Sequence, residues 1–385
     1  MKARLRPSGY PEGLDTFYEV RSRAMNEYIA FDSHKHYTLM EREAVDSEQV
    51  AQQRIEHSAG AIREALAGCQ PGTKVAVEAM GSWYWIVQEI EQAGLVPALV
   101  HPRKAKLMMG MINKTDKLDV HGLNRLQRNR TLPTVWIAPP GMRDLRELTR
   151  TRMILTQHRT RMKNRLLATL SKYGLDIEDC SDNFGAKARR QWPALLDKLP
   201  CQTRWSADML WEQLDLVVTQ IDKQEKRLEV LMEVTPQIAL MKTLPGVGLI
   251  LAGAMAMEIG DIERFACAER LASYAGTTPR VHSSGDKTRF GRLRPDANRY
   301  LKWAFIEAAN CVSLHASRQP ERHVSQLYRR LRYKRGHSKA IGAVARHMAE
   351  AAYWVLKTSQ PYRDPSLGRA KEGVSANAAC LRGEE

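Results

Sequence analysis

The chain has 385 residues and a formal net charge of +16 at pH 7, so we expect at least two domains and a polyanionic partner, with nucleic acid favoured over a membrane surface. No apolar run approaches the roughly 20 residues that span a bilayer, and the basic N-terminus lacks the apolar core of a secretory signal. The 6 cysteines form no CxxC pair, which argues against a zinc module and for a reducing cytoplasm.

The first quarter of the chain has the pattern of an α/β domain. Helical periodicity runs from about Ser47 to Leu66, and a second helix is predicted after Gly81 and ends at Gly94. Strands that alternate with helices imply a sheet covered by helices. The apolar runs typical of strands are Tyr28–Phe31, Val75–Val77 and Leu95–Val100.

Two long charged segments follow the proline pair Pro139 and Pro140. Residues 142–173 and 206–234 carry apolar positions every three or four residues, which predicts a helical hairpin or coiled-coil spacer with an irregular tip between the helices. A mostly helical section follows, and it opens with the motif LPGVG.

These patterns divide the chain into five predicted segments. They are an N-terminal extension (1–25), an α/β domain (26–140), a helical or coiled-coil spacer (141–235), a mostly α C-terminal domain (236–360) and a disordered tail (361–385).

Four carboxylates occupy positions that suit a metal site. Asp32 and Glu78 each end a predicted strand, where side chains project into the crevice that binds ligands in α/β sheets. Asp116 and Asp119 lie one helical turn apart, on one face of a helix. Taken alone, the second pair is more often a solvated edge. All four acids together predict Mg²⁺ ions that bridge a scissile phosphate and activate an oxygen nucleophile.

The C-terminal section contains two glycine motifs. LPGVG fits either a phosphate-binding helix start or a plain turn between helices. SSGDKTRFGR places two hydroxyls beside Lys287, Arg289 and Arg292, which fits either a serine nucleophile with its phosphate clamp or an anion-binding loop. The residues themselves leave both alternatives open.

A dense basic run follows in QLYRRLRYKRGHSK. Interleaved tyrosines, Tyr328 and Tyr333, suit stacking on unpaired bases, while the cations suit phosphate contacts. The alternative is a solvated helix face. The basic residues are Arg329, Arg330, Arg332, Lys334, Arg335 and Lys339.

These motifs resemble one known family. DSHKHYT, VAVEAMGSWYW and HPRKAKLMMGMINKTDKLD are similar to the strand-Asp, strand-Glu and helical KTDxxD segments of bacterial insertion-sequence family 110 transposases, also called bridge recombinases. LPGVG, FACAERLASYAGTTP, SSG and NRYLK resemble the C-terminal domain of the same family. The chain departs from the family in its polar N-terminal extension and in Met80, where threonine is usual.

The resemblance implies a RuvC-like (RNase H-like) N-terminal domain whose acids bind Mg²⁺. It also implies that Ser284, directly before glycine, attacks a DNA phosphate and becomes linked to it; a shift of one residue in the comparison would exchange it with Ser283. The metal site, rather than His282 or Asp286, is expected to activate this serine. The implied metal ligands are Asp32, Glu78, Asp116 and Asp119.

The family resemblance also implies partners. A noncoding guide RNA, the bridge RNA, pairs with donor and target DNA, and dimers assemble into a tetramer in the bacterial cytoplasm at the nucleoid. Two alternatives come from other classes. One is a RuvC-type structure-selective nuclease that uses metal-activated water, and the other is a non-catalytic nucleic-acid-binding protein.

Overall fold

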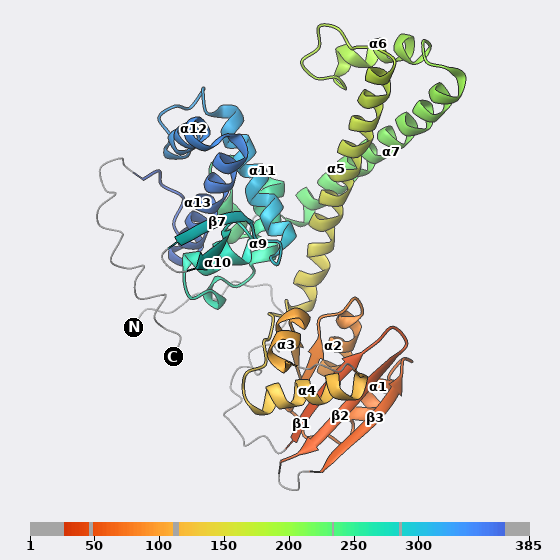
Figure 1. The fold of residues 1–385 in the computed structure, drawn as a ribbon, viewed down its shortest axis with the longest axis vertical. Helices are drawn as coiled ribbons and strands as arrows, with labels where there is room; N and C mark the ends of the chain where they lie inside the picture. Colours follow the sequence, from red (N-terminus) through yellow and green to blue (C-terminus); the bar gives the residue numbers. More distant parts are fainter. Residues whose placement is uncertain (1–26, 46–48, 111–114, 233–234, 285–286, 366–385) are drawn as a thin grey trace. The chain divides into compact units, whose positions relative to one another are not determined.

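The structure is a computed structural model that describes residues 27–45, 49–110, 115–232, 235–284 and 287–365. The chain forms two compact units, residues 1–137 and 138–385, and each is described by itself (Figure 1). The predicted N-terminal extension lies outside the described residues, as does the predicted tail beyond residue 365.

A five-stranded mixed sheet forms the centre of the first unit, in the order β3-β2-β1-β4-β5. The first three strands pair antiparallel, whereas β1, β4 and β5 run parallel to one another. This arrangement confirms the predicted α/β domain. The strands are β1 (Glu27–Ser33), β2 (Tyr37–Ala44), β3 (Val50–Glu56), β4 (Lys74–Glu78) and β5 (Val96–Val100).

Helices cover both faces of this sheet because its central strands are apolar on both sides. Phe31 and Val77 point to one face, where they pack with α1 (Ala61–Leu66) and α2 (Trp83–Gln92). Small residues occupy the other face: Ala30 and Ala76 lie against α3 (Pro102–Met109) and α4 (Asp116–Arg128). Alternating side chains of a strand point to opposite faces, so two buried faces require uninterrupted apolar sequence.

The helix predicted from Ser47 to Leu66 is wrong over its first part. Residues Val50–Glu56 form β3 at the edge of the sheet, and only Ala61–Leu66 of the predicted segment is helical. Most β3 side chains are exposed and Ile55 alone is buried. An edge strand with so little burial shows no apolar alternation, so sequence periodicity does not reveal it.

The second unit begins with two long antiparallel helices, α5 (Pro140–Lys172) and α7 (Cys201–Leu231). Arg152 donates to Glu225 at 2.9 Å near one end of the pair, and the Tyr173 hydroxyl lies 3.0 Å from that of Thr203 near the other. The predicted helical hairpin is therefore present. Its tip is not irregular: it contains α6 (Ala186–Leu196), because burial of Trp192 stabilises a helix despite its internal proline.

The rest of the second unit is helical, as predicted, except for one strand pair. The LPGVG motif forms the turn between α8 and α9, and Gly246 has φ +72°. A Cβ atom on this glycine would lie 2.5 Å from the Ala308 carbonyl oxygen in α11, so close helix packing explains the motif. The elements are α8 (Pro236–Met241), α9 (Leu249–Ile259), α10 (Ala268–Tyr274), β6 (Pro279–Ser284), β7 (Lys287–Leu293), α11 (Arg299–His315), α12 (His323–Arg335) and α13 (His337–Thr358).

Candidate active-site elements

Asp32 and Glu78 lie at the carboxyl ends of two neighbouring inner strands, β1 and β4. We call this end of the sheet the acid edge. β1 and β4 are parallel neighbours, and the last paired residues are Phe31 and Val77. Asp32 and Glu78 directly follow this pair, so both side chains are carried by the same end of adjacent strands. Asp32 is only 6% exposed, which is unusual for a carboxylate that lacks a strong cationic partner.

The helix α4 brings a second pair of acids to this edge. Its N-cap is Thr115, whose side chain accepts a hydrogen bond from the Leu118 amide. Asp116 and Asp119 occupy the first turn, where the helix dipole favours negative charge. The helix is fixed to β2 through the buried Glu41, which accepts a hydrogen bond from the Asn124 amide at 3.0 Å. The predicted helical DxxD pair is therefore anchored on the sheet.

A histidine and a tyrosine that the sequence analysis did not identify complete this cluster. His34 Nε2 lies 3.3 Å from Asp32 Oδ2 and 3.2 Å from Asp116 Oδ2. The Tyr37 hydroxyl donates to the same Asp116 oxygen at 2.8 Å. One potential ligand atom from each of Asp32, His34 and Asp116 lies within 4.8 Å of the others.

The electrostatics of this cluster favour a bound cation. Burial raises the pKa of Asp32, and the nearby charges of Asp116 and Asp119 raise it further, whereas His34 opposes the shift. Carboxylates held this close together repel one another, and a divalent cation relieves that repulsion. Carboxylate oxygens are also the ligands that Mg²⁺ prefers. The residues present therefore fit a divalent metal, since Asp32, His34 and Asp116 can each offer one ligand atom.

The described residues of the serine motif lie on a pair of strands. β6 and β7 pair antiparallel, with Ser284 opposite Lys287 and Ser283 opposite Thr288. The turn residues Gly285 and Asp286 lie outside the described part of the chain. Both serines are exposed, so each hydroxyl is accessible to a substrate from solvent.

Strand alternation separates the two serines. Ser284 shares its face with His282 and with the cross-strand cations Lys287 and Arg289. The opposite face carries Ser283, whose hydroxyl lies 3.3 Å from that of Thr288. The basic face of the hairpin is therefore the face of Ser284. The pairing shifts register between Val281 and Pro279, opposite the part of β7 that carries Arg292, so strict alternation does not extend to Arg292.

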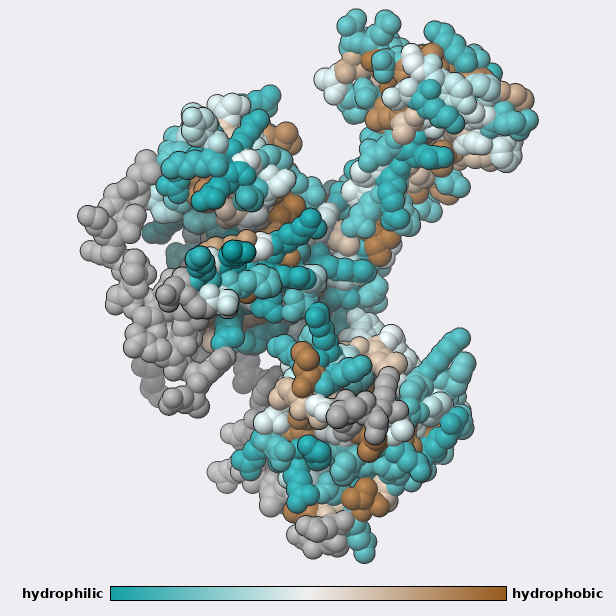
Figure 2. All heavy atoms as spheres, in the orientation of Figure 1, coloured by the Kyte–Doolittle hydropathy of each residue, from teal (hydrophilic) through white to brown (hydrophobic). Residues whose placement is uncertain are grey.

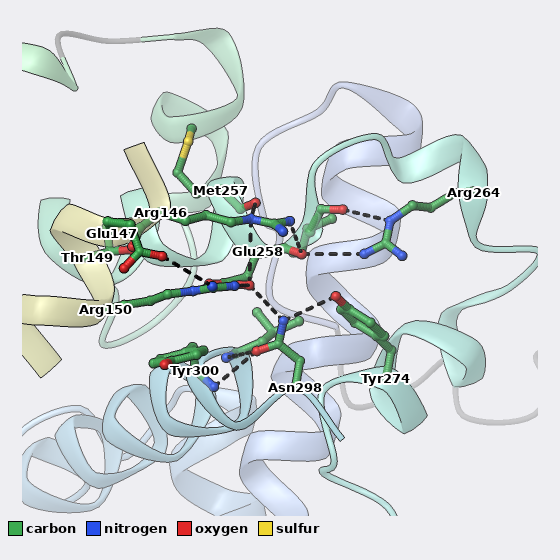
Figure 3. Close-up of polar contacts among 12 residues, drawn as sticks. Arg146, Glu147, Thr149, Arg150, Met257, Glu258, Arg264, Tyr274, Asn298 and Tyr300 are labelled. Atoms are coloured by element: carbon green, nitrogen blue, oxygen red, sulfur yellow. Dashed lines mark hydrogen bonds and ion pairs between the residues drawn. The ribbon is translucent and has the colours of Figure 1, made fainter. Parts of the chain in front are cut away.

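A buried polar network joins Asn298, which follows the hairpin in the chain, to helices α5 and α9 (Figure 3). At its centre Glu258 of α9 is fully buried and accepts hydrogen bonds from Arg150 of α5 at 2.7 Å and from Asn298 at 2.7 Å. Asn298 follows β7 and caps α11 through hydrogen bonds from the amides of Tyr300 and Leu301. Arg146 of α5 donates to the Met257 carbonyl at 2.8 Å. One carboxylate thus joins α5, α9 and α11.

We expect Glu258→Gln to destabilise the second unit by about 3–5 kcal/mol, because the change removes the buried negative charge that Arg146 and Arg150 share. Glu147→Gln is the matched control: Glu147 pairs with the same Arg150 at 3.6 Å, but its side chain is 57% exposed. A surface pair of this kind contributes at most about 1 kcal/mol. Urea unfolding followed by helical circular dichroism measures both variants. Equal effects of the two substitutions would contradict the buried-network role of Glu258.

The predicted basic run lies on α12 and the residues that follow it. Its arginines and lysines are exposed, and hydrophilic side chains dominate this region on the face shown in Figure 2. The two tyrosines differ. Tyr333 is 93% exposed, whereas Tyr328 is 4% exposed and lies 2.9 Å from His337 Nδ1. Stacking on a base is therefore open to Tyr333, but the expectation for Tyr328 is wrong because packing buries its ring.

Family comparisons match both units. A model described as a transposase of the DEDD insertion-sequence 110 type matches residues 30–175, and one described as the IS116/IS110/IS902 transposase family matches residues 238–325. Among the described residues, no helix is long and apolar enough to cross a membrane.

Several curated proteins are similar to the chain. A probable family 20 transposase of Pseudomonas aeruginosa is 24% identical over 253 residues, which cover 63% of this chain and 72% of the relative. The transposase for insertion sequence element IS1111A of Coxiella burnetii is 23% identical over 296 residues, covering 75% and 79%. The pilin gene-inverting protein of Moraxella bovis is 27% identical over 150 residues, covering 38% and 45%.

Proposed function

The chain belongs to the IS116/IS110/IS902 family of transposases, and from this membership we propose that it recombines DNA strands by a covalent serine mechanism that depends on a divalent metal. It is a DNA transposase. The observation that carries the metal part is the convergence of Asp32, Asp116 and His34 at one edge of the sheet. The basic hairpin face of Ser284 carries the covalent part.

The proposed chemistry is a transesterification at phosphorus. The Ser284 hydroxyl loses its proton and attacks a DNA phosphate, a bond forms between Oγ and phosphorus, and the 3′ oxygen leaves as a hydroxyl. The product is a 5′-phosphoserine, and attack by the 3′ hydroxyl of another strand rejoins the DNA and releases the serine. The number of phosphodiester-type bonds is unchanged at each step, so no external energy source is required.

The residues of the chain have separate tasks in this reaction. Lys287 and Arg289 share the face of Ser284 and would neutralise the phosphate that the serine attacks. A bound Mg²⁺ would stabilise the charge that develops on the phosphate oxygens. Asp32, Glu78, Asp116 and Asp119 would hold this metal. The acids and the serine belong to different units, so the mechanism requires them to act on one phosphate, within one chain or between subunits.

We further propose that a noncoding guide RNA supplies sequence specificity by pairing with donor and target DNA. The exposed cations of α12 suit the phosphate backbone of such an RNA or of DNA. Dimers that assemble into a tetramer would place two duplexes together. These cations are Arg329, Arg330, Arg332, Lys334 and Arg335.

The RNA proposal has a direct test. Purified full-length protein, expressed with the DNA that flanks its coding sequence, is expected to retain one discrete RNA species that contains segments complementary to donor and target DNA. Recoding one segment is expected to move recombination to the matching new target. Recombination that follows the original target after the RNA is recoded, or that proceeds without RNA, would contradict guidance.

A metal-dependent nuclease is the second candidate function, because the same acid cluster can activate a water molecule. Its product would be a free 5′ phosphate with an oxygen from water, without a protein adduct. The two functions therefore differ in where the phosphorus is attached after cleavage.

A further inference from the structure

We propose that His34 is a nitrogen ligand of the metal that Asp32 and Asp116 hold. This inference rests on the proposed function and adds to it a ligand outside the four acids. It predicts a mixed nitrogen and oxygen site, which differs in metal preference from a site built of carboxylates alone.

The distances suit a shared ion. Two ligand atoms bound at about 2.1 Å to one metal are about 3.0 Å apart when they are adjacent and about 4.2 Å apart when they are opposite. His34 Nε2 lies 3.3 Å from the Asp32 oxygen and 3.2 Å from the Asp116 oxygen. The whole set lies within 4.8 Å. Only a small adjustment is needed to centre an ion among the three atoms.

The imidazole nitrogen points at the two carboxylates that would share the metal. His34 Nε2 is hidden from solvent and meets no hydrogen-bond geometry, although it lies 3.3 Å from Asp32 Oδ2 and 3.2 Å from Asp116 Oδ2. A buried polar atom without a hydrogen bond costs free energy unless something else satisfies it. A metal bound between His34 and the two acids would satisfy this atom and both oxygens together.

Neighbouring side chains hold this arrangement in place. The His34 ring packs against Tyr37, with ring centroids 4.7 Å apart. Tyr37 in turn donates to Asp116 and lies under the Arg54 guanidinium, whose central carbon is 3.6 Å from the ring centroid. Such outer contacts orient metal ligands and tune their affinity. The tight strand connection between β1 and β2 brings His34 and Tyr37 to the acid edge together.

The alternative is that His34 serves only as a counter-charge to the two carboxylates. The alternatives differ in chemistry: a ligand must bond to the metal through nitrogen, whereas a counter-charge is displaced when a cation binds. An imidazole ligand also favours Mn²⁺ over Mg²⁺ more strongly than carboxylates do, because nitrogen donors bind later divalent metals better.

Pulsed electron paramagnetic resonance of Mn²⁺ bound to the full-length protein, without DNA, tests this inference. We expect nitrogen modulation from one directly bound imidazole. In His34→Ala the modulation disappears and Mn²⁺ affinity falls by at least about tenfold, while Mg²⁺ affinity changes less. His36→Ala is the matched control, since His36 is an exposed residue of the same strand connection, and it is expected to leave both unchanged.

The possible results distinguish failure of the whole metal site from failure of the ligand role of His34 alone. Asp32→Asn is expected to remove Mn²⁺ binding; retained binding in this variant would overturn the metal site itself. Loss of binding in Asp32→Asn, together with wild-type protein that shows no nitrogen modulation, would overturn the role of His34 alone. Persistence of the modulation in His34→Ala would do the same. Circular dichroism shows whether each variant is folded.

Discussion

Ser284→Ala is expected to reduce strand exchange by at least about 10⁴-fold, because removal of an enzyme nucleophile removes the covalent route entirely. The covalent protein–DNA adduct is expected to disappear as well, whereas binding of nucleic acid remains. Recombination between two plasmids and denaturing gels measure these effects.

The control for this substitution is Ser283→Ala. Ser283 lies on the opposite face of the hairpin, paired with Thr288, so its loss is expected to leave the adduct in place. Full activity of Ser284→Ala, or loss of the adduct in Ser283→Ala alone, would show that Ser283 and not Ser284 is the nucleophile.

Asp32→Asn is expected to lower strand cleavage by about 10³-fold or more, since a metal contributes several kcal/mol of transition-state stabilisation and each 1.36 kcal/mol is a factor of ten in rate. The substitution keeps the shape of the side chain but removes the charge of the most buried acid in the cluster. Cleavage of a labelled duplex as a function of Mg²⁺ concentration measures the effect. Cleavage at the wild-type rate would contradict a metal role for Asp32.

Asp32→Asn is expected to lower cleavage without lowering the stability of the fold. The pKa of Asp32 is raised by burial and by Asp116 and Asp119, so the carboxyl favours the folded state at low pH and opposes it once the pH exceeds the folded-state pKa. At neutral pH in EDTA, Asp32→Asn is therefore expected to melt at or above the wild-type temperature. A clearly lower melting temperature would show that Asp32 is needed for folding, and that the loss of cleavage is not specific.

Sequence patterns predicted the elements whose burial leaves a clear apolar run or a helical turn signal. β1, β4 and β5 are apolar because both sheet faces are covered, and α2 ends near Gly94, whose φ is +77°. β2 and β3 escaped prediction: β2 contains the sequence EREA, and β3 is an exposed edge. β2 is placed by its pairing with β1, and β3 by its pairing with β2, and periodicity encodes neither.

In the candidate site too, some residues could be predicted from local sequence and others only from the pairing of strands. Asp32 and Glu78 come at the ends of the apolar runs in β1 and β4, so their position at the same end of two neighbouring strands could be predicted. His34 could not, because its position depends on the antiparallel return of β2 after the strand connection. Ser284 was predicted as the nucleophile from the family resemblance, without the strand that carries it. Only the strand register shows that it shares a face with Lys287 and Arg289.

The buried network around Glu258 lay beyond any local signal. A single acid in the apolar helix LILAGAMAMEI indicates a buried partner, but nothing in that segment identifies which one. Its arginine partner Arg150 is 108 residues away in the chain. Such contacts between distant segments require the packing of α5 against α9.

Peptide mapping of the protein–DNA adduct, trapped on a cleaved duplex in water labelled with ¹⁸O, distinguishes a serine nucleophile from water. We expect a phosphodeoxynucleotide on Ser284 in the wild-type protein, no ¹⁸O in the attached phosphate, and no adduct in Asp32→Asn. A free 5′ phosphate that carries ¹⁸O would show that water is the nucleophile, and an adduct of undiminished yield in Asp32→Asn would separate the acids from the serine; either result would contradict the account.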